Sequence, residues 1–276
     1  MRAWEHLGRV PANALGGARR SVHHAAQIVA AAGITHVPAA EDDSHTNMEW
    51  MPSLRALAGR PAGGERPFRL AVRPEGLELL LLDAEDREED ARGLVGSTVD
   101  EGYAWAAGAI ARRTGSSLRP LVRPSWTIPP LGRETFSGAD DEALAELARW
   151  YGGAAHVLRA LADDIDGASE VRCWPHHFDI ATLLPGRSPE QTVGVGLSPG
   201  DESYPEPYWY VSPYPHPKDP VLPTLPEGGR WHRDGFFGAV LTGSDLLAGG
   251  AEGTQERRSR WFLEAAVADS LRMLGG

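Results

Sequence analysis

The strand-like segments of this chain follow one another in runs, joined by turns rather than by helices. Residues 67–83, PFRLAVRPEGLELLLLD, read as two strands about a Pro-Glu-Gly turn, and four more strand-like stretches follow Val171. Parallel strands require a long crossover connection, usually a helix, between neighbours, and no such alternation is present. The sequence therefore predicts an α+β fold with largely antiparallel sheets covered by helices.

Segments with helical periodicity precede and follow these runs of strands in the sequence. The expected helices are about 18–32, 98–113, 140–165 and 254–274. Gly33 would end the first helix at its C′ position, and Ser97 with Asp100 would form a capping box for the second. Between the hairpin and the second helix, the stretch DAEDREEDARG is expected to be an exposed acidic loop.

Each half of the chain thus has the order helix, strands, helix. The stretches HTNMEWMPSLRALAGRP, from His45, and HHFDIATLLPGRSP, from His176, both open on histidine and close on Gly-Arg followed by proline. We expect a single α+β domain over residues 1–276. A further hypothesis is that the halves 14–115 and 138–276 are two copies of one unit.

The composition narrows the classes of partner and location. The formal net charge of −11 disfavours binding to nucleic acid or to an anionic membrane, because both need a basic face. Cys173 is the only cysteine, which excludes an internal disulfide and any multi-cysteine zinc site. The longest strongly apolar run, 77–82, is far too short to span a bilayer. We expect a cytoplasmic protein whose partner is a small molecule.

Three motifs of the second half, in this order, carry a resemblance: WPHHFDIATLLPGR, SPGDESYPEPYWYVSPYP and WHRDGFFGAVL. Together with the early HHAAQIVAAAG and FRLAVRPEGLELLL they resemble a bacterial protein family known as a domain of unknown function. In that family the aromatic-then-FD segment and the later WH recur, whereas small residues often stand at the positions of His176 and His177. The resemblance implies no activity.

A metal site is predicted from pairs of side chains on the strands. Residues two apart in a strand share a face, which pairs His177 with Asp179, and His232 with Asp234. Two histidines and one carboxylate can hold a divalent ion such as zinc, iron or manganese. We therefore expect His177, Asp179 and His232 to converge on one ion, with His176 as a packing residue. The alternative is that these side chains form the solvated faces of half-buried strands.

An aromatic, proline-rich stretch supplies the predicted pocket. The substrate-binding residues expected from it and from the first half are Tyr204, Tyr208, Trp209, Tyr210, His45 and Glu49. Glu202 or Glu206 would transfer a proton. The alternative role of the stretch is an extended segment packed across the sheet, with wet tyrosine hydroxyls.

Two common enzyme classes are not expected from the sequence motifs. GLSPG, residues 196–200, matches the Gly-x-Ser-x-Gly nucleophile pattern, but Pro199 lacks the N–H that the oxyanion hole requires, so an α/β-hydrolase is not expected. Neither a Walker loop nor GxGxxG is present, so no nucleotide cofactor is predicted.

Two functions from different classes remain open. The first is a metal-assisted or acid–base enzyme that acts on a small, partly aromatic or apolar molecule. The second is a non-catalytic small-molecule binding or interaction module that uses the same aromatic residues.

The sequence also predicts a core in the second half. We expect the following aromatic and aliphatic residues to be largely buried: Trp174, Phe178, Ile180, Leu183, Trp209, Phe237, Trp261 and Phe262.

Overall fold

A computed structural model describes residues 4–136, 140–248 and 254–275. The chain forms two compact units, which we describe separately. The five-strand unit comprises residues 17–148 and 173–178, and the six-strand unit comprises 1–16, 149–172 and 179–276. Among the described residues, no helix is long and apolar enough to cross a membrane.

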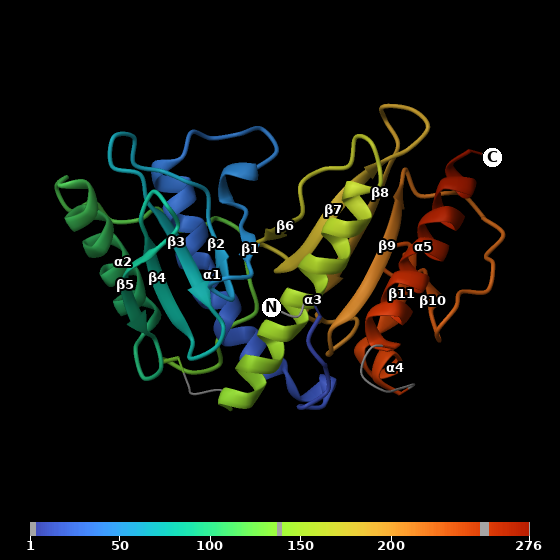
Figure 1. Cartoon of the computed structure of the whole chain (residues 1–276), viewed down its shortest axis with the longest axis horizontal. Coiled ribbons are helices and arrows are strands. Elements are labelled where there is room, and N and C mark those ends of the chain that lie inside the picture. The colour runs from blue at the N-terminus through green and yellow to red at the C-terminus, as the bar shows by residue number, and fades with distance from the viewer. Residues whose placement is uncertain (1–3, 137–139, 249–253, 276) are drawn as a thin grey trace. The chain divides into compact units, whose positions relative to one another are not determined.

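The predicted fold class is confirmed, because both sheets are antiparallel and helices accompany each (Figure 1). The strand order is β1-β2-β3-β4-β5 in one sheet and β10-β11-β9-β8-β7-β6 in the other. The first sheet is a simple meander, in which every strand pairs with its neighbours along the chain.

In the five-strand unit, helix α1 precedes the strands of the sheet along the chain and helix α2 follows them. Its elements are α1 Gly16–His36, the short 3-10 helix Ser44–Thr46, β1 Glu49–Met51, β2 Ala56–Ala58, β3 Arg69–Arg73, β4 Glu78–Leu82, β5 Glu88–Gly93 and α2 Val99–Thr114. The two helices touch at Gly102, where an added Cβ would lie 2.7 Å from Ile28 Cδ1. Leu79 of β4 lies at the same contact, so α1 and α2 cover one face of the sheet.

Helix α1 runs past the predicted stop at Gly33 and continues to His36. The glycine serves a different purpose, because an added Cβ would lie 2.3 Å from the backbone oxygen of His45. Gly33 therefore lets the 44–46 segment approach the helix closely, and it is not a C-terminal cap.

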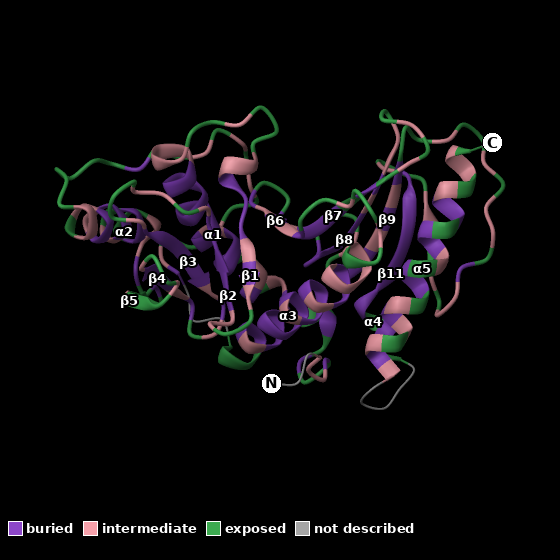
Figure 2. Ribbon diagram, turned by 45° about the horizontal axis from the view of Figure 1, so that its top comes forward, coloured by how far each residue is buried: buried purple, intermediate pink, exposed green. Residues whose placement is uncertain are grey.

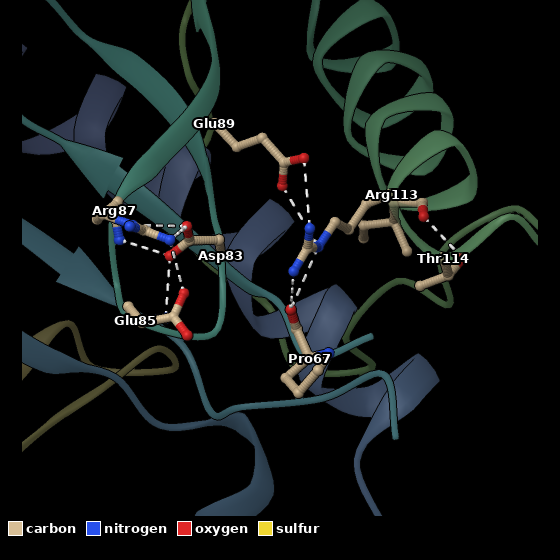
Figure 3. Close-up of polar contacts among 8 residues, drawn as sticks. Pro67, Asp83, Glu85, Arg87, Glu89, Arg113 and Thr114 are labelled. Atoms are coloured by element: carbon tan, nitrogen blue, oxygen red, sulfur yellow. Dashed lines mark hydrogen bonds and ion pairs between the residues drawn. The ribbon is translucent and has the colours of Figure 1, made fainter. Parts of the chain in front are cut away.

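The acidic stretch after β4 is not a loop, as the sequence predicted, but contains strand β5, which pairs antiparallel with β4. β5 is exposed at the edge of the sheet (Figure 2). Its charges are matched by arginines: Arg113 of α2 reaches Glu89 at 3.3 Å, and Arg87 in the turn reaches Asp83 at 2.8 Å (Figure 3). Ladder hydrogen bonds and these ion pairs outweigh the low strand propensity of the acidic residues.

The capping box of α2 is real but lies one residue later than predicted. Thr98, not Ser97, accepts a hydrogen bond from the backbone N–H of Glu101, and the Glu101 carboxylate accepts one from the N–H of Thr98. Two of the helix's otherwise unpaired donors are thereby satisfied.

The six-strand unit also has the order helix, strands, helix, but it has six strands and a short additional helix, α4, before the final helix. Its elements are the 3-10 helix Ala12–Ala14, α3 Asp141–Asp163, β6 Arg172–Trp174, β7 Asp179–Pro185, β8 Thr192–Ser198, β9 Tyr208–Tyr214, β10 Arg230–His232, β11 Gly238–Thr242, α4 Gly243–Leu247 and α5 Thr254–Leu274. The first residues of α3 and the end of β6 fall within the five-strand unit. Whether the predicted halves 14–115 and 138–276 are true copies stays a prediction; residues 138 and 139 lie outside the described part of the chain.

Helix α5 packs across β8 and β9 and closes the apolar face of the six-stranded sheet. Phe262 is fully buried and touches Gly229, where an added Cβ would lie 2.7 Å from its ring. Phe178, Ile180, Trp209 and Phe237 are buried, as predicted.

Three of the predicted core residues are not buried. Trp261 is 57% exposed and Leu183 is 51% exposed, while Trp174 is half-buried. For Trp261 the prediction was wrong because it placed two adjacent helix positions, Trp261 and Phe262, on one face. Adjacent positions point about 100° apart, so the helix can bury only one of them fully here.

Candidate functional site

The second face of the six-stranded sheet is polar and aromatic. Tyr208 and Tyr210 of β9 lie two residues apart and so share a face, where they pair with Ser198 and Gly196 of β8. Tyr208 is buried and Tyr210 is half-buried. The strand register therefore brings two of the predicted pocket residues together on the face opposite α5.

Each of these tyrosines donates its hydroxyl to an aspartate. Tyr208 Oη donates to Asp201 Oδ2 at 2.5 Å, and Tyr210 Oη donates to Asp179 Oδ2 in a short hydrogen bond. Burial raises the pKa of Tyr208 far above its ordinary value, and the hydrogen bond to Asp201 raises it further. Tyr208 therefore stays protonated at any physiological pH and is a fixed donor rather than a base.

A third tyrosine joins from the loop before β9. The ring centroid of Tyr204 lies 4.9 Å from that of Tyr208, and the Tyr204 hydroxyl lies 2.9 Å from His232 Nδ1. The guanidinium of Arg230 stands 5.3 Å from the Tyr204 ring centroid, within the range of a cation–π contact. We call Tyr204, Tyr208, Tyr210 and their partners Asp179, Asp201 and His232 the tyrosine face.

A glycine under the tyrosine face is required by the position of Tyr210. A Cβ added at Gly196 would lie 2.6 Å from the Tyr210 hydroxyl oxygen and 2.8 Å from the Cβ of Ala181. The Tyr210 side chain therefore lies across Gly196 on its way from β9 to Asp179 of β7. Any larger residue at position 196 would displace it.

Three predicted members of this site lie elsewhere or play structural parts. Trp209 is 1% exposed and, by strand alternation, points to the opposite, apolar face, so it does not line a surface with the tyrosines. Glu206 accepts hydrogen bonds from both the backbone N–H and the hydroxyl of Ser244, each at 2.6 Å, at the start of α4. Glu202 is exposed in the loop that precedes β9.

His45 and Glu49, the two pocket residues predicted from the first half, belong to the five-strand unit. His45 Nδ1 accepts a hydrogen bond from the backbone N–H of Ala40 at 3.2 Å. Glu49 forms an ion pair with the buried Arg69 at 2.5 Å. Both side chains stabilise local structure in that unit.

His177 is not on a strand, so it does not share a strand face with Asp179 as the predicted metal site requires. Residues 175–178 form a turn between β6 and β7, so His177 precedes the strand that begins at Asp179. His177 belongs to the five-strand unit, while Asp179 and His232 belong to the six-strand unit. Within the described ranges, no three or more His, Cys, Asp or Glu side chains form a group that could hold a metal ion.

His232 is engaged through both of its ring nitrogens. Nε2 donates to the backbone oxygen of Asp234, because a carbonyl oxygen can only accept, and Nδ1 forms a hydrogen bond with the Tyr204 hydroxyl. Asp234 lies beyond the end of β10, so the expected pairing with His232 on one strand face is not formed, and Asp234 contacts His232 through its backbone oxygen. A metal ion at His232 would have to displace one of these two hydrogen bonds.

Sequence reasoning missed a buried polar network in the five-strand unit. His23 and Gln27, one helical turn apart on α1, both reach the backbone oxygen of Pro175, at 2.8 and 2.7 Å. Burial lowers the pKa of His23 to about 4, so its ring is neutral and donates through Nε2. Their spacing of four residues on an apolar helix was the signal that they share one buried face.

The rejection of GLSPG as a nucleophile elbow agrees with the structure. Ser198 is the last residue of β8, it is buried, and the segment that follows leads into β9 and not into a helix. The elbow requires a strand-to-helix turn.

Comparison of the chain with protein-family models, with curated proteins and with solved structures finds no match. The resemblance to a bacterial domain of unknown function therefore stays a prediction.

Proposed function

We propose that this chain is a small-molecule binding protein whose ligand lies against the tyrosine face. The observation that carries the proposal is that three tyrosine hydroxyls are each tied to a fixed partner on one face of the six-stranded sheet. Rings held in this way lose little conformational freedom when a ligand arrives, so contact with them is converted efficiently into affinity.

The chemistry of the tyrosine face favours a ligand that carries a positive charge and an apolar or aromatic part. Asp179 and Asp201 add negative charge behind the rings, and the chain as a whole has a formal charge of −11. The position of Arg230 over Tyr204 is a cation–π contact within the protein itself. An organic cation on the neighbouring rings would use the same attraction.

The test is calorimetric titration with benzyltrimethylammonium and, as a neutral comparison, benzyl alcohol. A cation–π contribution of about 1–2 kcal/mol predicts that the cation binds roughly 5- to 30-fold more tightly. Tyr204→Leu should remove most of this preference. Tyr214→Leu is the matched control, because Tyr214 lies at the far end of β9, is 62% exposed and is not one of the tyrosines of the tyrosine face.

Equal binding of the charged and neutral probes would contradict the cationic ligand. An unchanged preference in Tyr204→Leu, or an equal loss in Tyr214→Leu, would contradict the tyrosine face as the site.

An acid–base enzyme is the second candidate, and the contact between Tyr204 and His232 favours it. The Tyr204 hydroxyl lies 2.9 Å from Nδ1 of His232, a distance at which a proton can pass between tyrosine and imidazole. Glu202 or Glu206 as the proton-transfer group, and a divalent ion on His177, Asp179 and His232, remain proposals from the sequence. Elemental analysis of the purified protein after supplementation with zinc, iron and manganese tests the ion.

A further inference from the structure

The turn Pro175–Phe178 holds an unusual backbone conformation. Phe178 has a φ of +61°, in the left-handed region that a bulky residue rarely adopts. Such a conformation is strained and persists only where the surrounding structure holds it firmly. The contacts of the turn show how it is held.

Four contacts hold the turn, all of them within the five-strand unit. The backbone oxygen of Pro175 accepts hydrogen bonds from His23 and Gln27, as described above. The Phe178 ring is buried and stacks on the His23 ring, with centroids 4.8 Å apart and planes 4° from parallel. The Phe178 N–H donates to the Trp174 backbone oxygen at 2.7 Å. The turn is therefore rigid before any ligand binds.

The turn presents two exposed histidines side by side. The ring centroids of His176 and His177 lie 4.4 Å apart, with planes tilted by 53°. Trp126 and Trp174 stand edge-on to the His176 ring, at 6.1 and 6.3 Å. Gln27 also fixes Trp126, because its Oε1 accepts from the indole N–H at 2.8 Å. One buried glutamine thus positions both the turn and a neighbouring tryptophan.

We propose that His176 and His177 are adjacent ligands of one divalent transition-metal ion, with Cu²⁺ or Ni²⁺ preferred. Two nitrogens that each bind an ion at about 2.0–2.1 Å lie about 3 Å apart when they are neighbouring ligands. Rings with centroids 4.4 Å apart can meet that requirement. Each imidazole has two nitrogens, so one can bind the ion while the other keeps a hydrogen bond.

The preference for Cu²⁺ or Ni²⁺ follows from ligand type and geometry. Imidazole suits both ions, and their tetragonal coordination places neighbouring ligands at about 90°. Affinity for a nitrogen site also rises toward Cu²⁺ along the divalent series. The remaining positions would be filled by water or by a small ligand, so the ion would stay open to exchange. This site keeps His177 from the set predicted by sequence and uses His176 in place of Asp179 and His232.

The test is titration of the full chain with CuCl₂, followed by calorimetry and by electron paramagnetic resonance. The wild-type protein should bind one equivalent, with nitrogen hyperfine structure from two imidazoles. His176→Ala and His177→Ala should each weaken binding by at least about tenfold and leave the signature of one imidazole. His216→Ala is the matched control, because His216 lies in a loop of the other unit.

A further variant tests whether the rigid turn contributes to metal binding or whether two exposed histidines would bind equally well without it. Gln27→Leu removes the hydrogen bonds to Pro175 and Trp126 but neither proposed ligand, and it should weaken Cu²⁺ binding several-fold. Circular dichroism confirms that each variant is folded. Undiminished binding in the double variant His176→Ala/His177→Ala, or an equal loss in His216→Ala, would overturn the proposal, as would an unchanged two-imidazole spectrum in His177→Ala. Because the tyrosine face is not involved, binding of benzyltrimethylammonium should be unchanged in all of these variants.

Discussion

The two units share the order helix, strands, helix, but the carboxylates of their sheets have different partners. In the five-stranded sheet, arginines stand between carboxylates: Arg69 contacts Glu49 and Asp86, and Arg73 contacts Glu78 and Glu88. In the six-stranded sheet, carboxylates instead accept from tyrosine hydroxyls.

This difference has a chemical consequence. A guanidinium between two carboxylates neutralises charge and holds strands in register, so those side chains have little left to offer a ligand. A tyrosine hydroxyl fixes a carboxylate without cancelling its charge, and the ring keeps an apolar face. The comparison therefore supports the proposal that a ligand binds at the tyrosine face, while the ion pairs of the five-stranded sheet hold its strands together.

The largest expected effect tests the core of the six-strand unit. Phe262→Ala should destabilise the protein by about 3–5 kcal/mol, because it removes a fully buried aromatic ring from the contact between α5 and the sheet. Trp261→Ala, one residue earlier, should change the free energy of unfolding by less than about 1 kcal/mol, because this side chain is largely exposed. Chemical denaturation measures both, and a reversal of the two values would show that α5 is rotated.

The next effect concerns the five-strand unit and depends on pH. The pKa of His23 is about 4 in the folded protein and 6.5 in the reference state, so between these values the unfolded chain binds a proton that the folded chain does not. Stability is complete above pH 6.5 and falls as the pH drops to about 4. The loss is about 3 kcal/mol at about 1.4 kcal/mol per pKa unit.

His23→Gln tests this dependence, because glutamine can still donate to Pro175 but does not titrate. Denaturation midpoints measured from pH 7 to pH 4 should decline less steeply in the variant than in the wild type. Identical slopes would show that another group is responsible.

The third prediction concerns the contribution of the arginine–carboxylate ion pairs of the five-stranded sheet to stability. Arg69→Met should destabilise by about 2–3 kcal/mol, since it removes the ion pair with Glu49 and a hydrogen bond to the Gly59 backbone oxygen. Arg87→Met should cost much less, because its ion pairs lie in an exposed turn (Figure 3). Comparable losses, measured by urea denaturation, would remove the distinction between the buried and the exposed pair.

The smallest effect tests the start of α2. Thr98→Ala should destabilise by about 1 kcal/mol through loss of the capping box, while Ser97→Ala should have a smaller effect. Thermal unfolding of the two variants distinguishes them. A larger loss in Ser97→Ala would restore the register that the sequence predicted.

Much of the fold followed from local signals. The hairpin at 67–83 carries a proline-glycine turn between apolar runs, and it forms strands β3 and β4. The four long helices appear within a few residues of their expected ranges. Helical period and turn chemistry are properties of neighbouring residues, so they are visible without the rest of the molecule.

The sequence predictions were wrong where residues distant in the sequence determine the local structure. Strand β5 depends on its hydrogen bonds to β4 and on arginines of α2. Neither contact can be predicted from the acidic stretch alone. Gly33 ends no helix, because its role is set by a segment twelve residues away. Trp261 and Phe262 are equally apolar neighbours, and only the orientation of α5 decides which one is buried.

For the candidate site, the order of residues alone indicated that histidines, aspartates and tyrosines gather after Val171, and that Pro199 lacks the N–H that a nucleophile elbow at Ser198 would need. Tertiary structure decided which of them meet. Strand register placed Tyr208 and Tyr210 on one face and Trp209 on the other, and His23 with Gln27 bent residues 175–178 into a turn. The physical reason is that side-chain direction depends on backbone conformation, and contacts remote in sequence set that conformation here.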